Sequence, residues 1–86
     1  MYPRIVGVEP RPPFIVQLRF ADGTGGSVDL SHWIRDSKGV FAALRDPSVF
    51  ESVTVDPEAG TIVWPNGADL DPDVLYELAH GVRTIP

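Results

Sequence analysis

The sequence predicts a small α+β domain, in which an N-terminal strand and two hairpins form an antiparallel sheet, short helical turns lie between them, and a helix follows at the C-terminal end. Three observations carry this prediction. Residues 14–20 alternate between apolar and polar side chains, two turn sequences each separate a pair of apolar segments, and apolar residues recur at helical spacing after Asp71 and Pro72. With 86 residues there is room for one core, so we expect residues 1–86 to form a single domain.

The first hairpin has the clearest strand pattern. Residues 14–20 place apolar side chains on one face and mostly polar ones on the other, as in a half-buried strand. The Asp-Gly pair at residues 22–23 favours a tight turn, because glycine tolerates the positive φ that such a turn needs. Residues 24–30 then return as a second strand, and the glycine pair at residues 25–26 suggests a β-bulge.

Two further segments complete the predicted sheet. Residues 4–9 form the N-terminal strand, and we expect Pro10 to end it because proline has no N–H for a ladder hydrogen bond. Residues 51–56 and 61–64 form the second hairpin around a turn at residues 57–60.

Helical segments are predicted where a capping side chain or a proline precedes apolar residues. They are a turn over residues 32–34 capped by Ser31, a short helix over residues 40–44, a turn from Pro47 to Phe50 capped by Asp46, and a helix over residues 72–80 capped by Asp71 and ended by Gly81. Residues 36–39 are expected to form a loop.

The two tryptophans have different expected roles. Trp64 follows a strand and lies beside Pro65, so we expect it in the core. Trp33 lies beside His32 in a short turn, where it either closes the core or anchors a partner.

The charge of the chain is unevenly distributed. The net charge is −5, but residues 1–45 hold six basic and four acidic residues, while residues 46–86 hold one basic and eight acidic residues. Such an acidic surface disfavours nucleic-acid binding and suits a basic partner, although it also serves solubility. There is no cysteine, signal peptide or membrane-length apolar run, so we expect a cytoplasmic, prokaryotic-type protein.

The acidic triplet Asp69, Asp71 and Asp73 has the spacing of the first ligands of a calcium loop. The loop would need glycine at its sixth position and glutamate at its twelfth, where this chain has Val74 and His80. Helix capping explains these carboxylates better, so we expect no metal and no cofactor.

No set of side chains demands a particular reaction. A zinc site built on the two histidines, His32 and His80, would need acidic ligands from distant segments, and nothing in the spacing suggests one. The carboxylates Asp22 and Asp29 do not lie in a stretch that promises a catalytic pocket, and Asp22 is expected to form a turn. We therefore expect that the chain is not an enzyme and has no catalytic residues.

The chain resembles a small prokaryotic family known as domain of unknown function 2442. The resemblance covers nearly the whole chain, and its most specific part is the block Trp64-Pro65-Asn66-Gly67-Ala68-Asp69. Weaker support comes from Leu18-x-Phe20-x-Asp22-Gly23, Val28-Asp29-Leu30, Gly39-x-Phe41-x-x-Leu44, Phe50, and Leu70-x-Pro72-x-x-Leu75-Tyr76. The resemblance implies an α+β domain without an assigned activity, and an antitoxin-like component of a small toxin–antitoxin-type pair.

We therefore predict a protein-interaction module whose partner is a small, basic protein. The candidate surface consists of Asn66, Asp69, Asp71 and Asp73, with Trp33 as an apolar anchor.

Two alternatives remain open. One is a self-associating structural domain, a homo-oligomer that uses the exposed edge of the first strand. The other is a small ligand-binding protein or hydrolase that uses Asp22, Asp29 and His32.

Overall fold

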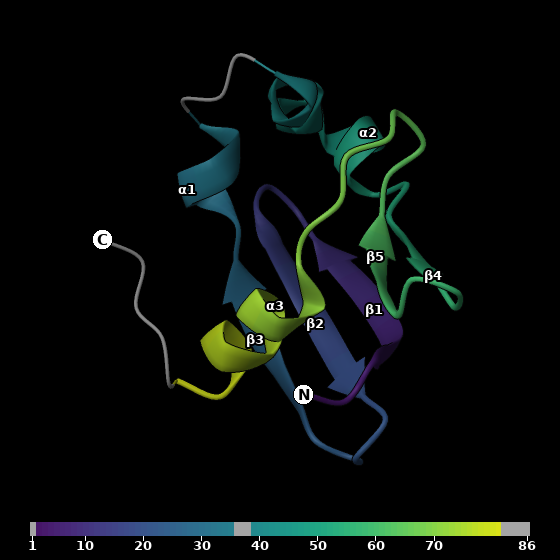
Figure 1. Cartoon of the computed structure of the whole chain (residues 1–86). Helices are drawn as coiled ribbons and strands as arrows, with labels where there is room; N and C mark the ends of the chain where they lie inside the picture. The colour runs from purple at the N-terminus through teal and green to yellow at the C-terminus, as the bar shows by residue number, and fades with distance from the viewer. Residues whose placement is uncertain (1, 36–38, 82–86) are drawn as a thin grey trace.

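The computed structural model describes residues 2–35 and 39–81 (Figure 1). Its strands are β1 (Ile5–Arg11), β2 (Ile15–Phe20), β3 (Gly25–Asp29), β4 (Thr54–Asp56) and β5 (Thr61–Val63). Its helices are α1 (Ser31–Ile34), the 3₁₀ helix η1 (Val40–Arg45), α2 (Pro47–Phe50) and α3 (Pro72–Ala79). The predicted α+β class is confirmed, and the strands divide into an antiparallel sheet β1-β2-β3 and an antiparallel pair β4-β5.

The alternation of β2 sets the two faces of the three-stranded sheet. Val16, Leu18 and Phe20 are buried on one face, and Val28 of β3 joins them. Helix α3 and the β4-β5 pair enclose this core from different sides, with α3 packed on β3 and the pair beside β1 (Figure 1). The opposite face carries the polar residues of the alternation.

Strand β1 is longer than predicted, because it does not end at Pro10. It continues to Arg11, with Pro10 opposite Val16 and Arg11 opposite Ile15. β1 is an edge strand of its sheet, and an edge strand accommodates a proline without breaking the ladder.

The bulge predicted at Gly25 and Gly26 is wrong. The β2-β3 register runs without a shift, whereas the irregularity lies in β1 between Ile5 and Gly7. Gly26 instead allows helix α3 to approach the sheet, since a Cβ there would lie 2.6 Å from the carbonyl oxygen of Ala79.

Two of the predicted caps are confirmed. The Asp46 side chain accepts a hydrogen bond from the Ser48 N–H at 2.9 Å, and the Asp71 side chain accepts one from the Asp73 N–H at 2.9 Å. In both helices a proline occupies the first turn, where its missing N–H is not needed.

The cap predicted at Ser31 is wrong. Leu30 is the N-cap residue of α1, and no side chain caps the helix. The Asp29 carboxylate accepts a hydrogen bond from the Ser31 N–H at 2.9 Å, so an aspartate two residues earlier satisfies this donor. Of the loop expected at residues 36–39, residues 36–38 lie outside the described part of the chain.

Trp64 is the largest fully buried side chain, as predicted. Its indole Nε1–H donates to the Phe50 carbonyl at 3.0 Å, which satisfies its polar group in the core. Trp33 is half-buried and packs against the edge of the core. The other buried apolar residues are Ile5, Leu30, Ile34, Leu44, Phe50, Val53, Ile62, Ala68 and Leu75. Within residues 2–35 and 39–81, no helix is long and apolar enough to cross a membrane.

Candidate interaction groove and open sheet face

A groove of about 560 Å³ lies where the N-terminal segment meets the start of helix α3. It is lined by residues 2–4, Ala21, residues 59–60 and residues 71–73, and we call it the α3 groove. It includes two of the residues that the sequence suggested for partner binding, Asp71 and Asp73.

The β4-β5 turn holds the N-terminal segment in place. Gly60 has a φ of +71°, which glycine adopts readily, and its carbonyl accepts the Ile5 N–H at 3.0 Å. A Cβ on Gly60 would lie 3.0 Å from the Cβ of Arg4, so the two segments touch. The Arg4 guanidinium donates a hydrogen bond to the Pro57 carbonyl, and this bond links Arg4 to the β4-β5 turn.

Aromatic rings connect the N-terminus to helix α3. The Tyr2 ring stacks on the Tyr76 ring with centroids 4.5 Å apart, and Tyr76 stacks on His80 at 3.9 Å. The Tyr2 hydroxyl donates to Oε2 of Glu77 at 3.1 Å. This hydrogen bond is the largest of the effects that raise the pKa of Tyr2, because it favours the protonated phenol.

The same helix face also binds the β2-β3 turn. The Tyr76 hydroxyl donates to Oδ2 of Asp22 at 2.9 Å, and the Thr24 hydroxyl donates to Oδ1 at 2.6 Å. The side-chain and backbone hydrogen bonds of Thr24 lower the pKa of Asp22, while the bond to Asp22 raises the pKa of Tyr76. His80 Nε2 lies 2.8 Å from the Thr24 hydroxyl, so His80 also contacts this turn.

Tyr2 and Tyr76 were not among the site residues predicted from the sequence. Tyr76 and His80 are four residues apart on a helix, a spacing that places them on one face and could have suggested the ring pair. Nothing local in the sequence indicates that Tyr2 stacks on this pair, because the two tyrosines are far apart along the chain.

The two aspartates of the α3 groove have different roles. Asp71 caps the helix with one oxygen. The Asp73 side chain is exposed and makes no hydrogen bond or ion pair with any residue in the described part of the chain. Because small apolar groups such as Ala21 and Ala59 line the groove beside it, a long cationic side chain fits here chemically, with its stem on the apolar surface and its charge near Asp73.

The remaining predicted site residues lie elsewhere. Asn66 bridges backbone groups, donating to the Val40 carbonyl at 2.9 Å and accepting from the Ala68 N–H at 3.1 Å. Asp69 is exposed and pairs with Val63 in an isolated β-bridge. Trp33 lies in α1, which packs against η1. The structure therefore joins Asp71 and Asp73 in one groove and places neither Trp33 nor Asn66 there.

The residues of the hydrolase alternative do not converge. Asp22 lies in the turn before β3, and Asp29 is the last residue of β3, opposite Ile15. Among the residues that the structure describes, no three His, Asp or Glu side chains are grouped so as to hold a metal. The edge proposed for self-association is partly covered, because β4 and β5 pack against β1 and the Ile5 N–H is bonded to Gly60.

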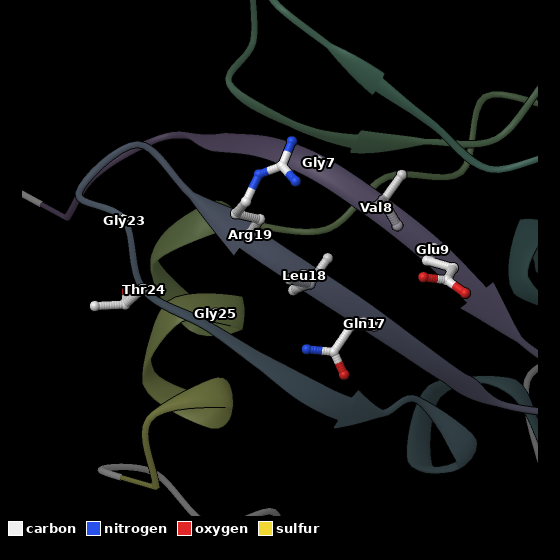
Figure 2. Close-up of a pocket in the computed structure, with 9 residues that line it drawn as sticks. All are labelled: Gly7, Val8, Glu9, Gln17, Leu18, Arg19, Gly23, Thr24 and Gly25. Atoms are coloured by element: carbon white, nitrogen blue, oxygen red, sulfur yellow. The ribbon is translucent and has the colours of Figure 1, made fainter.

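The face of the three-stranded sheet turned away from the core contains a second depression, of about 460 Å³ (Figure 2). We call this face the open face and the depression the Arg19 hollow. Its lining residues come from β1, β2, the β2-β3 turn and the start of β3, and the Arg19 side chain reaches across it toward Gly7 (Figure 2).

We compared the chain with protein-family models, with curated proteins and with solved structures. The model of a family described as "Protein of unknown function (DUF2442)" matches residues 5–81. Neither the curated proteins nor the solved structures gave a match. Because the match spans most of the sequence, from β1 to the end of α3, the chain belongs to the DUF2442 family.

Proposed function

We propose that this chain is a protein-interaction module that binds a small basic protein through the α3 groove. The observation that carries the proposal is the groove itself, in which the exposed Asp73 carboxylate lies at the edge of a surface formed by Ala21, Ala59 and Pro72. This combination suits a lysine or arginine side chain, whose aliphatic stem and charged head need two kinds of surface.

The charge distribution supports a basic partner. Residues 46–86 carry eight acidic residues and one basic residue, and this half of the chain supplies both aspartates of the groove. Complementary charge increases the association rate and excludes acidic competitors. The assignment as the antitoxin-like member of a toxin–antitoxin-type pair rests on the family resemblance, and the expectation that the chain is not an enzyme stays a prediction.

The first experiment is a tagged pull-down from the native host, with size exclusion and mass spectrometry of the eluted complex. We expect a small basic protein in stoichiometric amount. Asp73→Lys reverses the charge at the groove and should weaken the complex at least tenfold at low salt. Asp71 is left unchanged, because its carboxylate caps α3.

Glu51→Lys is the matched control. It makes the same charge change at an exposed residue after α2, outside the groove. Equal loss of binding in both variants would show that net charge matters rather than this groove. Recovery of the protein alone, as a monomer or homo-oligomer, would count against the proposal as a whole.

A further inference from the structure

The open face places Arg19 between two glycines. In the strand register Arg19 of β2 lies opposite Gly7 of β1 on one side and opposite Gly25 of β3 on the other. Neither neighbour has a side chain, so the guanidinium lies against Gly7 in a depression of the sheet surface that Glu9 and Gln17 also line (Figure 2).

Steric contacts explain why glycine occupies both positions. A Cβ on Gly7 would lie 3.1 Å from Arg19 Nη2 and 3.2 Å from its Cζ, so the guanidinium occupies space that a side chain would need. A Cβ on Gly25 would lie 2.7 Å from the backbone oxygen of Leu18. The Arg19 hollow therefore depends on the absence of side chains at Gly7 and Gly25 and on the conformation in which the Arg19 guanidinium lies against Gly7.

Arg19 differs from the other polar groups of the open face in its lack of partners. Those groups form three interactions: the Ser27 hydroxyl with Gln17 Oε1 at 2.6 Å, Arg11 with Glu9 at 3.4 Å, and Asp29 with the Ser31 N–H at 2.9 Å. Within residues 2–35 and 39–81, the Arg19 side chain makes no hydrogen bond or ion pair. Its donors are available to a ligand.

We propose that the Arg19 hollow binds a carboxylate side chain on an extended segment of a protein partner. The guanidinium presents parallel N–H donors that match the two oxygens of a carboxylate. A carboxylate carries one negative charge, which a chain of net charge −5 repels less than a phosphate. This site is distinct from the α3 groove, and it selects a ligand of the opposite charge.

The open face also suggests what should accompany the carboxylate. Ile15 lies on the same face of β2, four residues from Arg19, and is 37% exposed. Strand residues advance by about 3.3 Å each, so the two side chains are about 13 Å apart. Consider an extended peptide that lies along β2 with its acidic side chain at Arg19. An apolar residue four positions away in that peptide would then contact Ile15.

The test uses acetylated and amidated pentapeptides that carry glutamate and leucine at their two ends, in both orders, separated by Thr-Ser-Thr. Peptides with glutamine in place of glutamate are the matched ligand controls. Binding is followed by NMR through the Arg19 Nε–Hε resonance and the amides of Gly7 and Gly25. We expect one glutamate order to bind at least tenfold more tightly than its glutamine version.

Three variants locate the effect at Arg19, and a fourth is the control. Arg19→Gln should reduce binding to the level of the glutamine peptide, and Arg19→Lys should give an intermediate affinity because it keeps the charge and loses the paired donors. Gly7→Ala should weaken binding by displacing the guanidinium. Asp73→Asn should leave the ratio of the glutamate and glutamine affinities unchanged, so that this test is independent of the α3 groove.

Three results would overturn the proposal. The first is equal affinity for the glutamate and glutamine peptides, and the second is undiminished binding by Arg19→Gln in a protein whose other resonances are unchanged. The third is the same set of shifts with sodium acetate at the same carboxylate concentration, which would identify a free anion rather than a peptide as the ligand.

Discussion

The two faces of the β1-β2-β3 sheet are built from neighbouring residues but have different physical roles. On the core face, Val16 and Leu18 are fully buried. On the open face, Ile15 is 37% exposed and Arg19 is exposed, although each lies one residue from a core position. A strand residue therefore contributes either to packing or to the surface, according to its position in the alternation.

This difference separates stability from binding. Burial of apolar area is the main favourable contribution to folding, and the core face supplies it. The hydrogen bonds of the open face are exposed and contribute little, because water replaces them. Substitutions on the open face and at the edge of the α3 groove should therefore change binding with little effect on the free energy of unfolding.

The largest expected effect comes from the core face. Leu18→Ala should lower the free energy of unfolding by about 2–5 kcal/mol, because it removes apolar contacts and leaves a cavity. Ile15→Ala, three residues earlier on the open face, should cost less than about 1 kcal/mol. Equilibrium urea denaturation measures both. Similar losses in the two variants would contradict the separation of the faces.

A smaller effect is expected where helix α3 meets the sheet. Gly26→Ala places a methyl group against the Ala79 carbonyl, so the helix must shift, and we expect a loss of about 1–3 kcal/mol. Ser27→Ala is the control. Ser27 is adjacent to Gly26 but lies on the open face, and its substitution adds no atoms. Unchanged stability of Gly26→Ala would show that α3 packs less closely on β3.

The two groove aspartates extend the comparison to the α3 groove. Asp71→Ala removes the cap of α3 and should cost about 0.5–2 kcal/mol of stability. Asp73→Asn keeps the backbone N–H that donates to Asp71 and should cost about 0.3–1 kcal/mol through the helix dipole. In the partner-binding assay we expect the reverse order, with substitution of Asp73 weakening binding more than substitution of Asp71. A larger binding loss for Asp71→Asn, which preserves the cap acceptor, than for Asp73→Asn would reverse our assignment of their roles.

The sequence predicted the parts of the fold that local chemistry determines. The alternation of β2 follows from side chains two residues apart, and the caps at Asp46 and Asp71 follow from an acceptor beside a proline. Asp71 and Asp73 were also predicted as partner-binding residues, because the acidic C-terminal half of the chain is visible in the sequence.

Features that depend on tertiary contacts were not predictable in this way. Pro10 remains in β1 because that strand is at the edge of its sheet. Gly26 is needed for helix packing rather than for a bulge. The stacking of Tyr2 on Tyr76 and the position of Arg19 between two glycines depend on segments that meet only after folding.

The smallest expected effect is the pH dependence of the bond between helix α3 and the β2-β3 turn. Hydrogen bonds from Thr24, and then from Tyr76, lower the pKa of Asp22, so they stabilise the fold above the unfolded value of about 3.9. This contribution is lost as the pH falls through the pKa of the folded state. The hydrogen bond to Asp22 raises the pKa of Tyr76, so its contribution is present below about pH 10 and is lost as the pH rises through the folded value.

Urea midpoints measured between pH 3 and pH 11 distinguish this pair from other acids. Asp22→Asn should reduce the loss of stability at both ends of the range, because it removes the acid titration and the carboxylate whose hydrogen bond and charge raise the pKa of Tyr76. Asp46→Asn is the matched control, since hydrogen bonds from Ser48 also lower the pKa of Asp46 but no tyrosine contacts it. Asp46→Asn should change the stability only at the acid end of the pH range. If both variants change only the acid end, the Tyr76 hydroxyl does not contribute to stability through Asp22. The contact between His80 and Thr24 and the packing of Tyr76 and His80 on Phe20 would then hold the helix at this turn.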